Sequence, residues 1–557
     1  MNTSSLLRSP GRAALGLTAL LFLGAQSAHA MDLSVSGVEV TQAIQNYPGN
    51  SNPLVAGNHT AARVYVEVTN SATPVEGVTA FLSVYVNGSL HAILGPNAPG
   101  FITAPLVPDP NHQGDSLNFT LPVDLEAGDD VDLLVTLDPA NTVAEDDETN
   151  NTYTLADVAF ECRKTPEIVY TAVNYTAAAE TDPTTLGLPD PDRITAGTGD
   201  DFIFGIYPFP DDRFQYHSGP FPPITWNTDI DSSAVEFLTF LEDCRQSLSP
   251  VPEFLYAWFR ENPYSGNGRA ISIPGSVAFG NSQISPNRFQ RTFAHEMGHL
   301  FGMSHNSRDL APDTGWDVEN LLGLGNVEPG TKWDIMKPAQ FTPDAWVDDT
   351  SYEFMLAEDR IACTEDKPKL FKPYPYLTAI VWPWGGGTLG PAFEFPRAVA
   401  PSRSAARGDL FFEAVNSRGS VIERIAVAPN FESEAGERVD SAAVSVTFES
   451  LDDVQALQMV RDGRVLDRIV RSPNAPELSL NSPRRGDTLD GAFEVAWDGR
   501  DADGDELTYI VQYSSGYDDQ GERRWVPLAV RLRESKLAAD TRYLAGSSDA
   551  SLRIVAS

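Results

Sequence analysis

Residues 295–305 read His-Glu-Met-Gly-His-Leu-Phe-Gly-Met-Ser-His, and this stretch decides how the middle of the chain is interpreted. Two histidines four residues apart lie on one face of a helix, so His295 and His299 can hold the same ion. Gly302 follows one turn later and can adopt the positive φ that ends a helix. The chain can then turn back and bring His305 to the ion as a third nitrogen ligand. Three neutral imidazoles with a fourth position left to water form the open geometry of a catalytic zinc site.

Glu296 follows the first histidine and is placed to reach a water on the ion rather than the ion itself. Zinc lowers the pKa of its bound water towards neutrality. Glu296 would then act as the general base, accepting a proton as the water attacks a carbonyl carbon and delivering it to the leaving amine. The alternative is a buried helix that happens to carry histidines, and the match at every fixed position of the pattern argues against it.

The pattern HExxHxxGxxH resembles that of the metzincin clan of zinc metallopeptidases, whose second mark is a methionine turn beneath the metal. Trp333-Asp334-Ile335-Met336-Lys337-Pro338 resembles that turn, with Met336 as its methionine. Two positions depart from the better-known families. Asn306 follows the third histidine where those families carry other residues, and Pro338 stands where some of them have a switchable tyrosine ligand. The resemblance therefore implies the clan and leaves the family open.

The resemblance also implies a fold class: a multidomain protein with an α+β metzincin-like catalytic domain, residues 162–365, flanked by all-β sandwich domains. Within residues 162–365, the apolar pattern predicts two helices and two short strands, at residues 285–300, 232–248, 167–173 and 201–207. Residues 271–280 are β-prone and contain a proline suited to an edge. They are expected to form the substrate-side edge strand, to which an extended peptide could add.

The first thirty residues resemble a secretory signal peptide. Arg8 and Arg12 precede an apolar run at residues 13–25, and Ala28-His29-Ala30 carries small residues at the cleavage positions. No later stretch is apolar for long enough to cross a membrane. The sequence therefore predicts a secreted protein, extracellular or periplasmic, without a membrane span.

The three cysteines, Cys162, Cys244 and Cys363, lie within or at the borders of the expected catalytic domain. They allow three single disulfides with one thiol left over, and the sequence does not choose among them. Cys162 and Cys363 would clasp the domain, while Cys244 falls on an expected helix. A free Cys162 acting as an inhibitory zinc ligand is the alternative to a structural disulfide.

The chain has 39 basic and 77 acidic residues, and its formal net charge is −38. This balance argues against nucleic acid and anionic membrane surfaces as partners. It suits a soluble exported protein or one that holds Ca²⁺. With 557 residues and 42% hydrophobic composition, the chain has material for roughly three or four domains.

Three β-rich regions flank the expected catalytic domain. Residues 31–161 alternate apolar and polar positions, and the segment Glu148-Thr149-Asn150-Asn151 resembles the end of CARDB-like sandwich domains of exported bacterial proteins. That resemblance implies an adhesive or spacing role, with a cleft-blocking propeptide as the alternative. Residues 366–472 predict a further β-rich domain without recognisable chemistry. Residues 473–557 resemble an immunoglobulin or fibronectin-type sandwich, and an incomplete domain is one interpretation because the last strand signal reaches residue 556.

Asp501, Asp503 and Asp505 alternate around Gly504 in the last of these regions. Carboxylates at this spacing can converge on Ca²⁺. The helices and the twelfth-position glutamate of an EF-hand loop are absent from the sequence, and a solvated acidic turn is the simpler interpretation. The three aspartates are a candidate calcium site.

Taken together, these patterns predict a secreted zinc endopeptidase with a polypeptide substrate, carrying β modules for a cell-surface or matrix target. Two other functions stay open. One is a surface-targeted binding or adhesive protein with an inactive zinc domain, against which the intact Glu296 argues. The other is an amide hydrolase acting on cell-wall or glycoprotein substrates.

Overall fold

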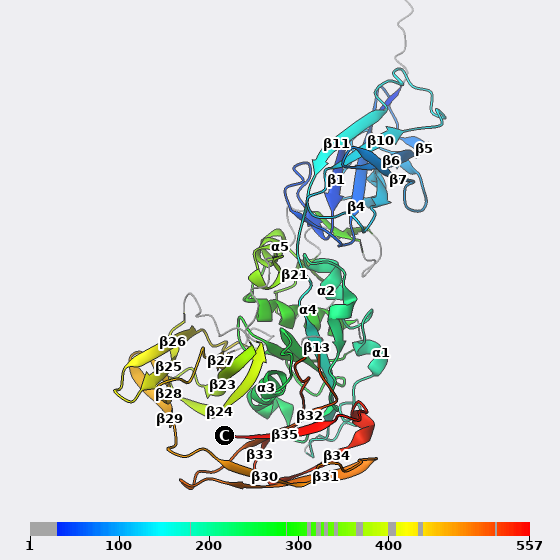
Figure 1. The fold of residues 1–557 in the computed structure, drawn as a ribbon. Helices are drawn as coiled ribbons and strands as arrows, with labels where there is room; N and C mark the ends of the chain where they lie inside the picture. The colour runs from blue at the N-terminus through cyan, green and yellow to red at the C-terminus, as the bar shows by residue number, and fades with distance from the viewer. Residues whose placement is uncertain are drawn as a thin grey trace, which may run out of the picture.

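The fold is seen in a computed structural model of the chain. It describes residues 31–178, 180–283, 285, 287–308, 314–318, 325–327, 332–338, 344–363, 371–398, 408–432, 438–518 and 521–557. The expected signal peptide, residues 1–30, lies outside the described residues. In Figure 1 the N-terminal strands form one end of the molecule, the helices lie in the middle, and two further groups of strands form the other end.

The expected fold class, an α+β metzincin-like catalytic domain flanked by all-β sandwich domains, is wrong. The described part of the chain is mostly β, with 42% strand, 13% helix and five α-helices, and its strands form many small sheets. In the middle of the chain, β13 (Ile168–Tyr175) pairs in parallel with β16 (Phe254–Phe259), and β16 with β18 (Val277–Asn281). An α+β domain instead segregates its helices from an antiparallel sheet. The histidine motif specifies one helix and leaves open how the preceding strands pair.

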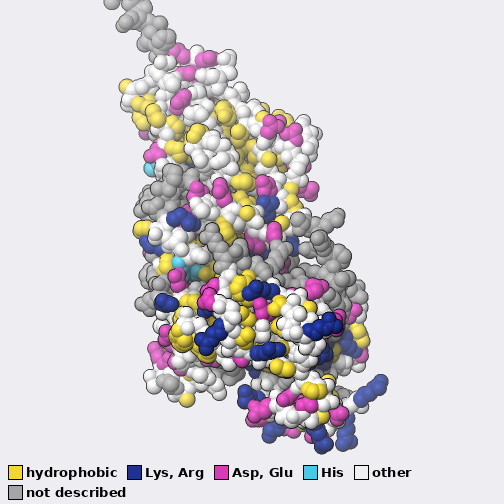
Figure 2. Space-filling view, turned by 90° about the vertical axis from the view of Figure 1, so that its left-hand side faces the viewer, with side chains coloured by type: hydrophobic (Ala, Val, Ile, Leu, Met, Phe, Trp, Pro, Cys, Tyr) yellow, Lys and Arg dark blue, Asp and Glu magenta, His cyan; other side chains and the backbone are white. Residues whose placement is uncertain are grey.

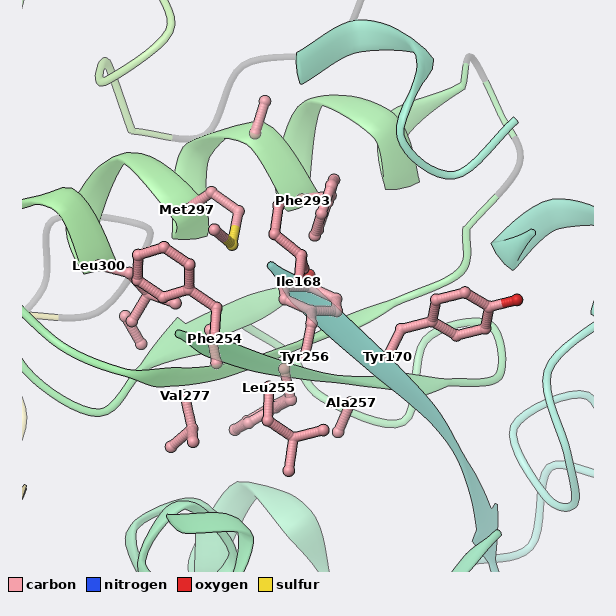
Figure 3. Close-up of a cluster of buried hydrophobic side chains, with 14 of the residues drawn as sticks. Ile168, Tyr170, Phe254, Leu255, Tyr256, Ala257, Val277, Phe293, Met297 and Leu300 are labelled. Atoms are coloured by element: carbon pink, nitrogen blue, oxygen red, sulfur yellow. The ribbon is translucent and has the colours of Figure 1, made fainter. Parts of the chain in front are cut away.

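This parallel sheet is covered by a helix on each face, α4 (Arg288–Phe301) on one and α3 (Ile230–Gln246) on the other. Alternate residues of β16 point to opposite faces, as Figure 3 shows. Phe254 packs against Phe301, with ring centroids 5.0 Å apart, and Tyr256 against Phe293 at 4.7 Å. All six residues of β16 are buried, as expected for a parallel strand covered on both sides. The sheet therefore fixes the position of α4, which carries the histidine motif.

The ends of the two long helices lie close to the expected ones. The carboxylate of Asp229 accepts a hydrogen bond from the Ser232 amide at the start of α3. Helix α4 begins at Arg288 rather than at Ser285. It ends where predicted, at Gly302, whose φ of 114° is left-handed.

The strand expected at residues 201–207 is instead helix α2 (Asp201–Ile206), although the strand expected at 167–173 is present as β13. Short apolar runs such as Phe-Ile-Phe-Gly-Ile cannot be assigned to strand or helix by periodicity alone. The remaining short elements of this region are α1 (Pro191–Ile194), β14 (Tyr216–Ser218), β15 (Ile224–Trp226), β19 (Thr314–Asp317), β20 (Gly325–Val327), β21 (Trp333–Asp334), β22 (Ala345–Trp346) and α5 (Asp349–Leu356).

The edge strand expected at residues 271–280 is also placed differently. The outer strand is β17 (Gly268–Ala270), which pairs antiparallel with β18. Residues 271–276 form the connection between β17 and β18, and it contains Pro274. Strand β18 itself lies between β16 and β17 and has no free edge. The sheet edge beside α4 is therefore formed by residues that precede the predicted segment.

The N-terminal region, residues 31–161, contains two main antiparallel sheets that share one buried apolar cluster. One sheet has the order β1 (Asp32–Thr41), β4 (Ala61–Thr69), β9 (Ser116–Thr120). The other has the order β11 (Thr152–Val158), β10 (Val131–Leu137), β6 (Ala80–Val86), β7 (Ser89–Leu94). Short pairs are formed by β5 (Val75–Val78) with β8 (Ile102–Ala104) and by β3 (Leu54–Val55) with β12 (Phe160–Glu161), and β2 (Ile44–Gln45) pairs with β19.

Residues 371–470, the third region, form two antiparallel sheets around their own apolar cluster. Their orders are β24 (Gly387–Ala398), β23 (Phe371–Val381), β27 (Ala442–Thr447) and β26 (Val421–Val427), β25 (Leu410–Asn416), β28 (Val454–Arg461), β29 (Arg464–Val470). The C-terminal strands form two more, β30 (Glu477–Ser482), β31 (Ala492–Arg500), β34 (Lys536–Asp540) and β33 (Val526–Leu532), β32 (Tyr509–Ser514), β35 (Ser551–Ala556).

Buried polar contacts join these regions to the helices. Arg531, in the C-terminal region, has a left-handed φ of 56°. Its guanidinium contacts Asp243 and donates to Thr239 at 2.9 Å, both on α3, and to Thr378 on β23 at 2.8 Å. At the other end, the Trp346 indole donates to the Ala43 carbonyl at 2.7 Å. The strands at both ends of the molecule therefore pack directly on the helical middle.

The surface carries the acidic excess of the composition. In the face seen in Figure 2, Asp and Glu side chains are spread throughout, whereas Lys and Arg gather in the middle and lower part. Among the described residues, no helix is both long enough and apolar enough to cross a membrane.

The cysteines pair as Cys162–Cys363, with a sequence separation of 201 residues, and Cys244 is a buried free thiol. The disulfide closes the helical middle at its two ends. The alternative of Cys162 as an inhibitory zinc ligand is therefore excluded in this structure.

We expect alkylation of the native protein to leave Cys244 unmodified, because this thiol is buried. After unfolding without reductant, alkylation should modify one thiol, because the other two cysteines remain in the disulfide. Joint replacement of Cys162 and Cys363 by Ser should lower the free energy of unfolding by about 2–5 kcal/mol, since a long loop is no longer closed. Mass spectrometry of alkylated peptides and denaturant titration measure the two effects. A Cys244 found in a disulfide would contradict the assignment.

Candidate metal centre

The three histidines of the motif converge. His295 and His299 lie one turn apart on α4, and the chain after Gly302 returns His305 to them. Nε2 of His305 lies 3.1 Å from Nε2 of His295 and 3.0 Å from Nε2 of His299. Three nitrogens held about 2.0–2.1 Å from a tetrahedral zinc lie about 3.3 Å from one another. The separations observed are close to that value.

Hydrogen bonds on the other ring nitrogens decide which way the three rings present their lone pairs. Nδ1 of His299 donates to the Met303 carbonyl at 2.7 Å. Nδ1 of His295 lies 2.7 Å from the Ile335 carbonyl and 3.1 Å from the Arg291 guanidinium, and the shorter contact, to the carbonyl, favours a protonated Nδ1. In a neutral ring, a protonated Nδ1 leaves Nε2 as an acceptor. The Nε2 atoms then face one another as acceptors, and a shared cation satisfies them. This donor set fits a metal ion bound by nitrogen ligands.

The rings are also neutral, as metal ligands must be. Burial lowers the pKa of His299 to about 3. Burial, followed by the neighbouring Arg291 guanidinium, holds the pKa of His295 well below its usual value. The pKa of His305 is lowered by burial, with the Glu432 carboxylate acting in the opposite direction. All three shifts favour the neutral form of the ring, which is the form that binds a metal.

Glu296 is buried on the same helix, between the motif and the sheet edge. Its position relative to β17 is shown by Gly268, where an added Cβ would come within 2.8 Å of Oε1 of Glu296 and 2.7 Å of Thr292 Cγ2. The carboxylate therefore lies directly against the outer strand. A side chain at residue 268 would displace it.

Met336, the methionine of the segment that resembles a methionine turn, packs against the histidine helix at Gly298. An added Cβ on Gly298 would come 2.5 Å from the Met336 sulfur, 2.8 Å from Tyr207 Oη and 2.9 Å from Met303 Cε. The Tyr207 hydroxyl donates to the Ala294 carbonyl at 2.8 Å. The glycine inside the motif thus provides the space in which the methionine turn and Tyr207 pack against α4.

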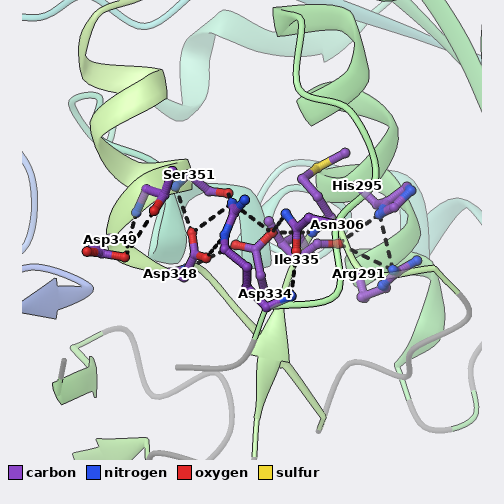
Figure 4. Close-up of polar contacts among 11 residues, drawn as sticks. Arg291, His295, Asn306, Asp334, Ile335, Asp348, Asp349 and Ser351 are labelled. Carbon is purple, nitrogen blue, oxygen red and sulfur yellow. Dashed lines mark hydrogen bonds and ion pairs between the residues drawn. The ribbon is translucent and has the colours of Figure 1, made fainter. Parts of the chain in front are cut away.

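A second group of residues, which the sequence analysis missed, fastens this turn to the helix (Figure 4). Arg291, one turn before His295, is fully buried, and its guanidinium donates to the carbonyls of Ile335 (3.3 Å) and Lys337. The carboxylate of Asp334 accepts from the Met336 amide at 3.0 Å. The sequence signal that could have identified Arg291 is its position four residues before His295, on the same face of the helix.

Asn306 connects the third-histidine loop to the same turn. Its side-chain amide donates to Asp334 at 2.5 Å, and its main-chain N–H donates to the Met336 carbonyl at 3.2 Å. Burial, followed by the nearby Asp348 carboxylate, raises the pKa of Asp334 to about 6. Asn306 is thus the residue that joins the loop of His305 to the methionine turn.

Asp348 extends these contacts to helix α5. It accepts from the Ser351 amide at 2.7 Å as the helix cap, and its carboxylate is also bound by Arg308 at 3.1 Å. The Asp348 amide donates to Asp334 at 3.0 Å. The methionine turn is therefore held between α4 and α5.

The aspartates proposed as a calcium site also come together, but on the surface. Asp501, Asp503 and Asp505 offer oxygens within 4.8 Å of one another. Asp503 accepts from the Asn474 amide groups at 2.8 Å, and Asp505 is bound by the Ser472 hydroxyl. These carboxylates thus hold the segment that leads into the C-terminal strands, and we do not assign calcium to them.

Comparisons with known proteins give partial matches. No family model matches the chain, and no curated protein matches it. Among solved structures, the CARDB domain of a Pyrococcus furiosus protein matches in its crystal and solution structures at 20% identity. The matches cover 24% of this chain and 89% and 97% of those chains, with TM-scores of 0.16 and 0.15. They coincide with the CARDB-like domain expected at the N-terminal region.

A β-glycosidase from Bacteroides vulgatus matches at 10% identity, covering 94% of this chain and 78% of that chain, with a TM-score of 0.15. A glycoside hydrolase family 2 β-glucuronidase matches at 9% identity over 94% of this chain and 60% of that chain, with a TM-score of 0.14. At these TM-scores, none of the structural matches carries an argument about activity.

We expect Gly298→Ala to lower the free energy of unfolding by roughly 1–3 kcal/mol, because its Cβ would overlap the Met336 sulfur. This loss would occur although alanine is intrinsically the better helix former. Gly95→Ala is the matched control, since its Cβ would meet open space. Denaturant titration of both variants measures the difference, and equal stability would contradict the packing described.

Proposed function

We propose that this chain is an exported zinc-dependent endopeptidase, with His295, His299 and His305 as the metal ligands and Glu296 as the general base. The observation that carries the proposal is the convergence of the three Nε2 atoms, together with a buried glutamate on the same helix. The resemblance of the motif, and of the Met336 turn, to metzincin-clan peptidases supports it at the level of the residues. The proposal does not include the fold of that clan.

Zinc is the metal that best suits this donor set, because three imidazoles with one open position are typical of catalytic zinc sites. When bound, zinc supplies Lewis acidity: it lowers the pKa of water and polarises a carbonyl oxygen. The chain's own residues hold the ion through Nε2 and fix the tautomers through Nδ1.

Glu296 supplies the proton transfers. Its carboxylate is buried and lies against Gly268 of the outer strand, and Glu296 follows His295 directly on α4. There it would accept the proton of the attacking water and deliver it to the nitrogen of the leaving amine. The C–N bond breaks as the C–O bond forms, and the products are a carboxylic acid and an amine.

The proposed location is outside the cytoplasm. The signal-like first thirty residues and the Cys162–Cys363 disulfide both favour an oxidising compartment. The β regions at both ends of the chain are proposed to target the enzyme to a cell surface or matrix.

Replacing Glu296 by Gln should leave one zinc bound and abolish peptide hydrolysis, because the metal ligands remain while the base is lost. His299→Ala should lose both zinc and activity. The matched control is Glu236→Gln, an exposed glutamate on α3. Metal analysis and a quenched mixed-peptide library, assayed with and without a zinc chelator, measure these effects.

Hydrolysis by Glu296→Gln at the wild-type rate would refute the assigned base. Zinc retained by His299→Ala would refute the metal site. An amide hydrolase specific for cell-wall or glycoprotein substrates would hydrolyse those substrates and not the peptide library. A binding protein without activity would hold zinc in its wild-type form and hydrolyse neither class of substrate.

A further inference from the structure

The third histidine is held differently from the other two. His295 and His299 donate to main-chain carbonyls. Nδ1 of His305 instead lies 3.4 Å from Oε2 of Glu432, a side-chain carboxylate. Glu432 follows β26 and belongs to the third region, far along the chain from the motif. The side chain of His305 is 9% exposed and that of Glu432 is 58% exposed, so the carboxylate reaches a mostly buried ring from the solvent side.

We propose that Glu432 is a positioning residue of the metal centre. The third region would then contribute a side chain to this centre rather than act as an independent module. This inference rests on the proposed metal site. Glu432 orients His305 and does not touch the ion.

Glu432 is a positioning residue rather than a metal ligand because of the side of the His305 ring that it contacts. The converging atoms are the Nε2 nitrogens, whereas Glu432 faces Nδ1 of His305 on the opposite side of the ring. A carboxylate on the far nitrogen fixes the tautomer and the ring orientation and makes the ligand nitrogen more basic. A charged acceptor does this more strongly than a main-chain carbonyl.

The third region is docked firmly enough to hold Glu432 in place. Arg269, on the outer strand β17, donates to the Ser441 carbonyl at 2.7 Å. The Ser445 hydroxyl, on β27, donates to the buried carboxylate of Glu242 on α3 at 3.0 Å. Arg531 reaches Thr378 on β23 from the C-terminal region. These contacts bring the third region against the outer strand β17, beside α4, and against α3 on the opposite face of the sheet.

Of the three histidines, His305 is the one whose ring is least constrained by its own secondary structure. It lies beyond the end of α4, in the loop after Gly302, while the other two histidines are fixed by the helix. Its neighbour Asn306 is fastened to Asp334 and Met336, which holds the main chain but leaves the ring to be oriented. Glu432 supplies that orientation.

The test is zinc affinity of the full-length protein, measured by competition with a chromophoric zinc chelator. We expect Glu432→Ala to weaken zinc binding by about 10–100-fold, the usual loss when an outer partner of a metal ligand is removed. Glu432→Gln should recover part of the affinity, because its amide oxygen can still accept from Nδ1. Glu394→Ala, which removes an exposed carboxylate of the same region, should bind zinc like the wild type.

Wild-type affinity in Glu432→Ala would overturn the inference, as would an equal loss in Glu394→Ala or no recovery in Glu432→Gln. Circular dichroism of the apo-proteins shows whether Glu432→Ala is folded. If it is not, Glu432→Gln against wild type decides, with weaker zinc binding expected and equal binding refuting the role. His299→Ala separates the two proposals: zinc retained there refutes the metal site itself, whereas zinc lost there and kept in Glu432→Ala refutes only the role of Glu432.

Discussion

The proposed site depends on three imidazole nitrogens that face one another, with Nε2 of His305 lying 3.1 Å and 3.0 Å from Nε2 of His295 and His299. Buried acceptors without a donor are costly, so such an arrangement persists only when the surroundings determine it and a cation completes it. The surroundings here are the acceptors on the far side of each ring, the carbonyls of Met303 and Ile335 and the carboxylate of Glu432. In the proposed metal site, each of them would favour the tautomer that leaves Nε2 for the ion.

The other features of the site can be understood as holding those acceptors in position. The Ile335 carbonyl belongs to the methionine turn, which is fastened by Arg291 from α4 and by Asp334 from within. Gly298 lets the turn approach the helix, and the helix is itself braced by the aromatic packing of α4 on β16. A change in the sheet would therefore reach the metal ligands through α4.

The pattern around His295 predicted part of the local structure, because fixed spacing on a helix limits where side chains can lie. The end of the helix at Gly302 and the convergence of His295, His299 and His305 are confirmed, whereas the bound metal and the role of Glu296 stay predictions. The pairing of the strands does not follow, because the apolar runs at β13, β16 and β18 suit either a parallel or a mixed sheet. A different ambiguity, between strand and helix in a short apolar run, explains why the strand expected at residues 201–207 is helix α2.

Contacts between distant segments were beyond reach for a different reason. Asp334 and Asn306 lie within recognised segments, but the sequence does not show that they contact each other, and Glu432 carries no local pattern at all. The cysteine pairing was likewise undetermined until Cys162 and Cys363 were seen to meet.

The most direct measurement of this account is zinc X-ray absorption of the full-length protein loaded with one equivalent of metal. We predict three imidazole nitrogens about 2.0–2.1 Å from the ion, with one water oxygen completing the shell. His305→Ala should reduce the imidazole contribution to two. A shell without imidazole scattering, or one unchanged by His305→Ala, would contradict the convergence of His295, His299 and His305 on a metal.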